Sequence, residues 1–200
     1  EVERKVSGKS LDEIEIRSTL PQQANIRPAG EDVAKGQLVL KHGTLIRPGE
    51  IGALASLGKA TVKVIRRPVV AILSTGDELR QPGEPLTPGQ IYDINSFSVA
   101  ASVERYGGVP KILGVAQDTL DSMNAKLEEG LEADMLLTSA GVSKGDYDIV
   151  KDVLAKRGEI SFWSVRMRPA KPLAFGLLDA TDGRRVPHLG LPGNPVSALV

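Results

Sequence analysis

The chain has 200 residues, of which 41% are hydrophobic and 25% are charged, and it contains no cysteine. This composition indicates a folded protein with a mainly aliphatic core, because only 4% of the residues are aromatic, and it excludes disulfides, thiolate metal sites and cysteine nucleophiles. Lys plus Arg and Asp plus Glu each number 25, so the formal net charge is zero and the broad positive charge typical of nonspecific nucleic-acid binding is absent.

The first part of the chain predicts a small accessory region. Residues 36–43 alternate apolar and polar side chains between glycines, which is typical of small strands and turns, and residues 61–64 predict another strand. Residues 51–58 predict a short helix between them. Pro68 follows two arginines and predicts a linker there, because proline restricts the residue before it to extended conformations. We therefore expect an incomplete β-rich accessory and linker region over residues 1–66.

From Pro68 onward, strand-length apolar runs alternate with helix-length segments. This alternation is typical of an α/β domain with a mostly parallel sheet and helices on both faces, which we expect over residues 67–200. The predicted strands are 69–74, 109–115, 134–138, 160–167, 173–178 and 186–189, and the predicted helices are 95–106 (capped by Asn95), 119–132, 148–157 and one that begins at Pro195.

The sequence shows no membrane or secretion segment. Its longest apolar runs, such as residues 69–73, have the length of a strand and fall far short of the roughly 20 residues of a membrane span. Residues 1–5 are mostly charged, unlike a signal peptide. We therefore expect a cytoplasmic protein that binds neither membrane nor nucleic acid.

Carboxylate side chains follow three of the predicted strands. Asp77 and Glu78 come after the first strand, Asp118 after the second, and Asp146 and Asp148 after the third. Ligands bind outside the carboxyl ends of the strands in open α/β sheets, so we expect these carboxylates to gather at one edge. Their mutual repulsion favours a bound cation, and Mg²⁺ suits oxygen ligands in a chain without cysteine and with only two histidines. Helix capping by Asp118 and Asp148 explains these two residues equally well.

Three cations lie close together at the end of a later predicted strand. Arg166, Arg168 and Lys171 alternate there with Pro169 and Pro172. The prolines lower the entropic cost of holding the Lys171 ammonium in place, as a preorganised oxyanion site requires. A solvated basic turn is the plainer interpretation, and the flanking prolines favour anion binding over it.

Two further loops offer backbone N–H groups to an anion. Residues 141–145 contain two glycines with Ser143 and Lys144, which is a weak phosphate-loop pattern without the spacing of a nucleotide-binding fingerprint. Asn194 with its following proline has the pattern of a helix start, which leaves N–H donors beside Ser197. Many such helix starts bind only water.

The serine, histidine and aspartate residues do not suggest a hydrolase triad. His188 lies within a predicted strand, and His42 lies in the accessory region. We interpret His188 as a structural residue rather than a catalyst.

Five segments stand out as a set. They are Ser-Thr-Gly-Asp-Glu-Leu at 74–79, Gly-Gln-Ile-Tyr-Asp-Ile-Asn at 89–95, Thr-Ser-Ala-Gly-Val-Ser at 138–143, Arg-Pro-Ala-Lys-Pro at 168–172 and Gly-Leu-Pro-Gly-Asn-Pro-Val-Ser at 190–197. In this order they resemble the molybdopterin molybdenumtransferase family. Residues 27–64 are similar to the region before this domain in that family, so the resemblance covers nearly the whole chain.

The resemblance implies the last step of molybdenum cofactor biosynthesis. Adenylylated molybdopterin is hydrolysed, AMP is released, and molybdenum from molybdate is inserted into the released dithiolene with the assistance of Mg²⁺. By this resemblance Asp118 and Asp148 are catalytic and bind the metal, and Glu78 and Lys171 are further catalytic residues. The substrate-binding residues that it implies are Gly141, Ser143, Asp146, Arg168, Pro172, Asn194 and Ser197.

The sequence departs from the common family pattern at four positions. Ala140 and Ala170 stand where glycine is usual or common, Lys144 stands where an apolar residue is frequent, and Arg168 stands where lysine is common. Arginine keeps the charge of lysine but presents it in a different geometry.

The resemblance also implies properties of a longer protein. They are a homodimer, a molybdopterin adenylyltransferase as neighbour in the pathway, and truncation of the domain at 67–200 before a C-terminal β domain. The truncated fragment would then lack part of the oxyanion site.

Two other functions are compatible with a domain of this kind. A molybdopterin adenylyltransferase uses a similar domain, but it normally lacks both the accessory segment and the Pro-Gly-Asn-Pro-Val-Ser sequence of 192–197, so the sequence disfavours it. A non-catalytic pterin-binding or scaffold module would have the same fold and would bind without turnover.

Overall fold

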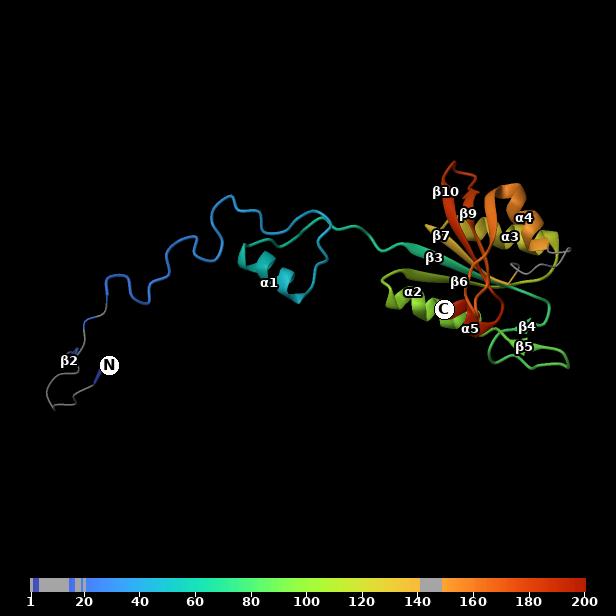
Figure 1. Ribbon diagram of the computed structural model, residues 1–200, viewed down its shortest axis with the longest axis horizontal. Coiled ribbons are helices and arrows are strands. Elements are labelled where there is room, and N and C mark those ends of the chain that lie inside the picture. The colour runs from blue at the N-terminus through green and yellow to red at the C-terminus, as the bar shows by residue number, and fades with distance from the viewer. Residues whose placement is uncertain (1, 4–14, 17–18, 20, 141–148) are drawn as a thin grey trace. The chain divides into compact units, whose positions relative to one another are not determined.

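The computed structural model describes residues 2–3, 15–16, 19, 21–140 and 149–200. The chain divides into two compact units, residues 1–64 and residues 65–200 (Figure 1). Each unit is described by itself below. The division after residue 66 that the sequence suggests stays a prediction.

The first unit contains little regular structure in its described part. Strands β1 (Val2–Glu3) and β2 (Glu15–Ile16) form a short antiparallel pair, and helix α1 spans Pro48–Ser56. The helix begins three residues before the predicted start because Pro48 occupies its first turn and the Glu50 carboxylate accepts the Arg47 N–H at 2.9 Å.

The strands predicted at 36–43 and 61–64 are wrong. Both segments are turns or irregular backbone without a ladder partner, and Leu38 and Val64 are exposed. Alternation of apolar and polar residues favours a strand only where another strand supplies hydrogen bonds and a surface to pack against.

A six-stranded sheet in the order β6-β3-β7-β10-β9-β8 forms the centre of the second unit. Every neighbouring pair is parallel except the two pairs that include β9. The predicted fold class, a mostly parallel sheet with helices on both faces, is confirmed. The strands are β3 (Val69–Thr75), β6 (Val109–Ala116), β7 (Met135–Ser139), β8 (Gly158–Ser164), β9 (Pro172–Asp179) and β10 (Arg185–Leu191).

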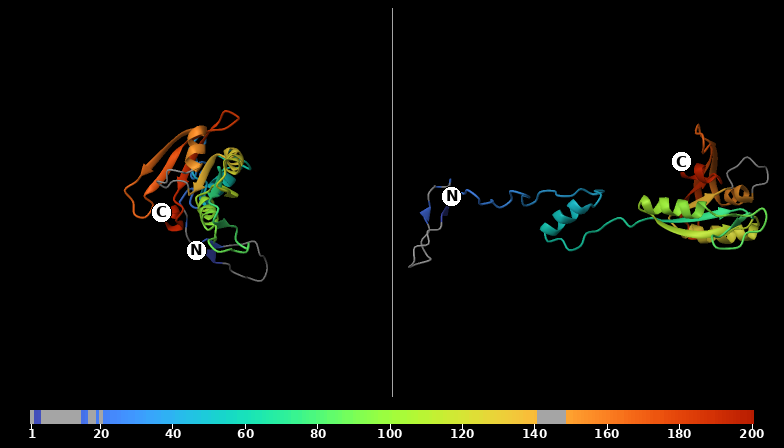
Figure 2. Two further views of the ribbon diagram at one scale, coloured as in Figure 1. Left: turned by 90° about the vertical axis from the view of Figure 1, so that its right-hand side faces the viewer. Right: turned by 90° about the horizontal axis from the view of Figure 1, so that it is seen from below.

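Helices cover both faces of this sheet (Figure 2). Helix α2 (Asn95–Arg105) packs on one face, and α3 (Leu120–Leu131) and α4 (Ile149–Arg157) lie on the other. The inner strand β3 is apolar on both faces for this reason, and each fully buried leucine or isoleucine contributes about 2 kcal/mol to the free energy of folding. The remaining elements of this unit are the short parallel strands β4 (Leu79–Arg80) and β5 (Ile91–Tyr92) and helix α5 (Pro195–Leu199).

The chain changes direction across the sheet at β3. It leaves β3 through α2 to reach β6 on one side, and it then returns through α3 to β7 on the other side of β3. Connections that diverge in this way leave a crevice outside the carboxyl ends of the two neighbouring strands, here β3 and β7. The topology therefore marks that crevice as the place for a ligand.

The prediction that Asn95 caps α2 is wrong. Asn95 is the first residue of the helix, Ile94 occupies the capping position, and the Asp93 carboxylate accepts the Ser96 N–H at 3.1 Å. The Asp93 carboxylate, one residue before the capping position, therefore makes the capping hydrogen bond that was expected of Asn95. The Asn95 side chain consequently points into the protein, where only 7% of the residue is exposed.

Candidate active site

One edge of the six-stranded sheet collects all of the predicted site residues that the structure describes. The loops after β3, β6 and β10 leave this edge, because these strands are parallel. Strand β9 is antiparallel, so its first residues and the turn that joins it to β8 lie at the same edge.

The loops after β3 and β6 are joined by hydrogen bonds. The Gly76 N–H donates to the Ala116 carbonyl at 3.4 Å, and the Asp118 N–H donates to the Asp77 carboxylate at 3.1 Å. Gly76 has a φ of 139°, and a Cβ placed there would lie 2.5 Å from a carboxylate oxygen of Glu78. Glycine therefore lets the Glu78 side chain fold back over the loop, and the bond to the Asp77 carboxylate places the Asp118 backbone beside Asp77. Asp77, Glu78 and Asp118, which follow the two neighbouring strands β3 and β6, are called the acidic group below.

Helix α3 is capped by Thr119, not by Asp118. The Thr119 hydroxyl oxygen accepts the Ser122 N–H at 3.3 Å, and Thr119 occupies the capping position. This finding contradicts the capping interpretation of Asp118. For Asp148 the two interpretations stay open, because this residue lies outside the described residues.

Four of the predicted site residues lie outside the described part of the chain: Gly141, Ser143, Asp146 and Asp148. Over residues 21–140 and 149–200 there is no group of three or more His, Cys, Asp or Glu side chains that could hold a metal ion. The Mg²⁺ site consequently stays a prediction that depends on Asp118 together with Asp148.

A cavity of about 690 Å³ lies beside this acidic group, along the edge strand β6. A bulge opposite Ile72 and Leu73 displaces β6 there. Polar side chains such as Asp77, Gln81 and Gln117 line the cavity together with the apolar Leu79 and Leu113.

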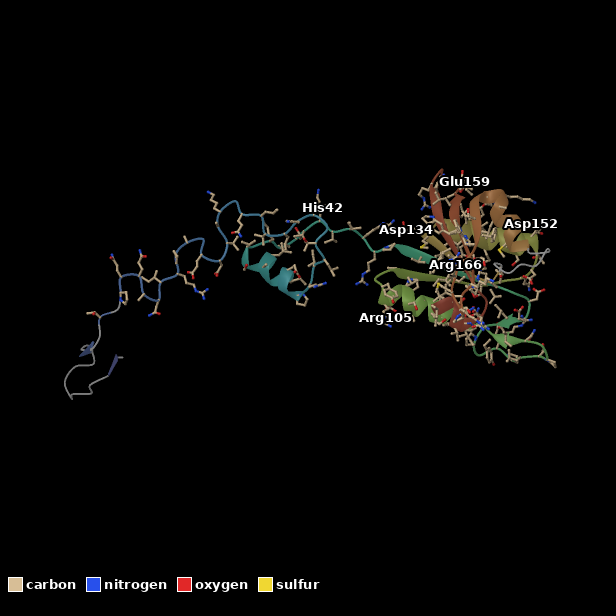
Figure 3. The ribbon with its side chains drawn as sticks, in the orientation of Figure 1. His42, Arg105, Asp134, Asp152, Glu159 and Arg166 are labelled. Carbon is tan, nitrogen blue, oxygen red and sulfur yellow. The ribbon has the colours of Figure 1, made fainter. Side chains whose placement is uncertain are left out.

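The turn between β8 and β9 forms a second cavity of about 690 Å³. A hydrogen bond of 2.9 Å from the Val165 N–H to the Lys171 carbonyl closes this turn. Arg166 lies at the opposite end of β8 from Glu159 (Figure 3) and lines the cavity with Arg168 and Lys171. No ion pair joins these three cations to an acidic side chain within the described residues, so the cavity is a place where an anion would be held by charge.

The structure brings Arg168, Lys171, Pro172 and Ser197 to the lining of this one cavity, and their roles stay predictions. Ala170 has a φ of 70°, a conformation that costs little for glycine and more for alanine.

The helix start predicted at Asn194 is confirmed. The Asn194 side-chain oxygen accepts the N–H groups of Val196 and Ser197 at 3.0 and 3.3 Å, and Pro195 occupies the first turn. These bonds fix the Asn194 carboxamide and the backbone of Ser197 next to the cationic cavity.

A buried polar network joins the carboxyl end of β3 to the start of α2, and sequence reasoning missed it. The Asp93 carboxylate accepts the Ser74 hydroxyl at 3.0 Å, and the Ser74 and Ser96 hydroxyls are 3.0 Å apart. The signal in the sequence is the Asp-x-Asn pair at 93–95, of which Asn95 was expected only to cap the helix. Polar side chains buried at strand ends indicate a site that holds its geometry before a ligand binds.

His188 is a structural residue, as the sequence analysis interpreted it. It is fully buried, and its Nε2 lies 3.0 Å from the Thr138 hydroxyl. Burial lowers the pKa of His188 to about 4, so the ring is neutral at pH 7.

The buried ring predicts a loss of stability in mild acid. An unfolded chain protonates His188 near pH 6.5, whereas the folded chain does so only near pH 4. Between these values the unfolded state binds the proton, so the free energy of unfolding falls with falling pH, by at most about 1.4 kcal/mol per pH unit from this residue. We expect His188→Gln to flatten the dependence in urea titrations from pH 6.5 to 4. The control His42→Gln changes an exposed ring, and an equally steep dependence in both variants would contradict the assignment.

Within the described residues, no helix is long and apolar enough to cross a bilayer.

Comparison with protein families assigns both parts of the chain. Residues 71–200 match the family described as "Probable molybdopterin binding domain", and residues 1–58 match "MoeA N-terminal region (domain I and II)".

Named relatives match over most of this chain. A molybdopterin molybdenumtransferase of Haemophilus influenzae is 45% identical over 92% of this chain and 45% of its own length. The Bacillus subtilis protein of the same name is 37% identical over 97% of this chain and 44% of its own length. The chain thus spans about half the length of these curated relatives.

Two solved structures resemble this chain to different degrees. A molybdopterin biosynthesis moea protein from Pyrococcus horikosii is 35% identical with a TM-score of 0.71, and the match covers 85% of this chain and 41% of that one. The tungsten cofactor synthesizing protein MoaB from Pyrococcus furiosus is 15% identical with a TM-score of 0.50 over 68% of this chain and 88% of its own, which shows a shared fold alone. The resemblance drawn from the five sequence segments is confirmed, and the chain belongs to the family of the probable molybdopterin binding domain.

Proposed function

We propose that this chain is part of a molybdopterin molybdenumtransferase. The reaction inserts molybdenum into adenylylated molybdopterin, hydrolyses the adenylate and releases AMP. The observation that carries the proposal is the pairing of an acidic group with a cationic cavity at one edge of the sheet, in a chain whose relatives have this name. The reaction has two substrates: one carries a phosphoanhydride, and the other is a tetrahedral oxyanion. The first needs the acidic group to hold a cation, and the second needs the cationic cavity.

The acidic group would act on the phosphoanhydride. Asp118 and Asp148 would bind Mg²⁺, and Glu78 would support them, because carboxylate oxygens are the ligands that this hard cation prefers. When bound, the metal would neutralise charge on the phosphate that leaves with AMP. The described carboxylates fit this role in chemistry, with Asp77 holding the Asp118 backbone in place. The cavity beside β6, with its polar and apolar lining, would hold the adenylate.

The cationic cavity would bind molybdate. Lys171 and Arg168 would supply the charge, and Pro172 and Ser197 would complete the lining. The remaining predicted residues, Gly141, Ser143, Asp146 and Asn194, would contact the molybdopterin.

Further properties follow from the same proposal. The full-length protein would form a homodimer, would work in the cytoplasm, and would receive its substrate from a molybdopterin adenylyltransferase. Several exposed apolar side chains of the first unit, such as Ile26, Leu38 and Leu45, support a partner chain there.

One assay decides among the functions. The full-length protein receives adenylylated molybdopterin, molybdate and Mg²⁺, and AMP release is measured together with activation of a cofactor-free molybdoenzyme. We expect both. ATP-dependent adenylylation of molybdopterin without molybdenum insertion would identify an adenylyltransferase, and pterin binding without either reaction would identify a non-catalytic module.

A further inference from the structure

The side-chain amide of Asn95 joins the end of β7 to the loop that follows β10 in the candidate site. Its nitrogen donates to the Ser139 hydroxyl oxygen and to the Gly193 carbonyl, the latter at 2.8 Å. Both hydrogens of the amide are therefore used. Ser139 ends β7, and Gly193 lies in the loop between β10 and α5.

These contacts extend the pairing of β7 and β10 beyond the sheet. The ladder ends with Ser139 opposite Leu191, and one more bond of 3.1 Å runs from the Ala140 N–H to the Leu191 carbonyl. Beyond that point Gly193 lies close to Ala140, since a Cβ on Gly193 would lie 3.6 Å from the Ala140 Cβ. Asn95 is the side chain that holds Gly193 at this distance from β7.

Gly193 is linked to the cationic cavity through the start of helix α5. Gly193 precedes Asn194, whose side chain accepts the N–H groups of Val196 and Ser197, and Ser197 lines the cavity with Lys171. A shift of Gly193 would therefore move the helix start and Ser197 with it.

The amide oxygen of Asn95 is evidence that this residue does more than start helix α2. The Asn95 oxygen is buried and has no hydrogen-bond partner among the described residues. A buried acceptor without a donor destabilises a fold, and serine or aspartate would start a helix without this cost. Asparagine supplies these two donors without a charge, which serine and aspartate cannot do.

We propose that Asn95 is a positioning residue: its amide sets the spacing between the end of β7 and the loop after β10 and thereby places Ser197 at the cationic cavity. This inference rests on the proposed function, since it takes molybdate as the ligand of that cavity. Ser139 takes part as the acceptor at the end of β7. Its own hydroxyl hydrogen is left to donate to a further acceptor at the crevice.

The test uses Asn95→Asp, which keeps the size of the side chain and removes both donors. The matched control is Ser98→Ala, which removes a hydroxyl bonded to the Asn95 carbonyl in the same turn and leaves the amide's bonds to Ser139 and Gly193 in place. Amide hydrogen exchange in the full-length protein is the first measurement. We expect the Val196 and Ser197 amides to exchange about tenfold faster in Asn95→Asp only, with Ile72 in β3 unchanged.

Molybdate affinity, measured by calorimetry, is the second measurement. We expect it to fall about tenfold in Asn95→Asp and to stay within about twofold of the parent in Ser98→Ala. Asn95→Ala, which introduces no new charge, is expected to behave like Asn95→Asp and replaces it if that variant does not fold.

Unchanged exchange at Val196 and Ser197 would overturn the positioning role, and so would faster exchange with parental molybdate affinity. A uniform increase of exchange through β3 and α3 would show a general structural role instead and would also overturn it. A parent protein that binds no molybdate would overturn the proposed function and this inference with it.

Discussion

Asp118→Asn is expected to lower the rate of AMP release from adenylylated molybdopterin by about 100-fold in the full-length protein. The substitution keeps the shape of the side chain and removes the negative charge that a hard cation needs. Folding should be nearly unchanged, because Thr119 caps the helix and the Asp118 backbone N–H keeps its bond to Asp77. The Mg²⁺ concentration that gives half-maximal activity should rise.

The matched control is Asp121→Asn, which removes a carboxylate from the first turn of α3, three residues further along the chain. We expect it to release AMP at nearly the parental rate. Asp148→Asn should reproduce the loss seen in Asp118→Asn, and chelation with EDTA should abolish AMP release in the parent until Mg²⁺ is added back. If both variants keep the parental rate and the parental Mg²⁺ dependence, the metal assignment is wrong and the carboxylates are structural.

Lys171→Ala is expected to raise the KM for molybdate by about 10-fold to 100-fold with little change in melting temperature. The turn holds this ammonium at a cavity with Arg166 and Arg168, and the backbone bond from Val165 to the Lys171 carbonyl does not depend on the side chain. The loss should be smaller at high ionic strength, because salt already weakens the attraction between the oxyanion and the parental site.

Lys156→Ala supplies the comparison, since it removes an exposed ammonium from α4, away from the turn. It should leave molybdate use unchanged. A large fall in the melting temperature of Lys171→Ala, combined with a normal dependence on molybdate, would show that this lysine holds the fold instead.

The sequence alone was sufficient for the elements whose pattern is local. Residues 69–75 form a strand because a continuous apolar run can be buried on both faces, and the Asn-Pro pair at 194–195 starts a helix because it satisfies free N–H groups with its own side chain. The mostly parallel fold followed from the alternation of such elements. The family followed from five segments whose order is specific although each one is short.

The tertiary structure decided what depends on partners far away in the sequence. Residues 36–43 have the alternation of a strand but find no neighbouring strand to supply hydrogen bonds. Asparagine is a residue type that often caps helices, yet Asp93 takes that role at α2. The Asn95 amide is therefore available to bond Gly193, 98 residues further along the chain. The antiparallel course of β9 returns Lys171 to the edge where Asp118 lies. The type of a side chain limits which hydrogen bonds it can make. The packing of strands that are distant in the sequence determines which of those bonds form.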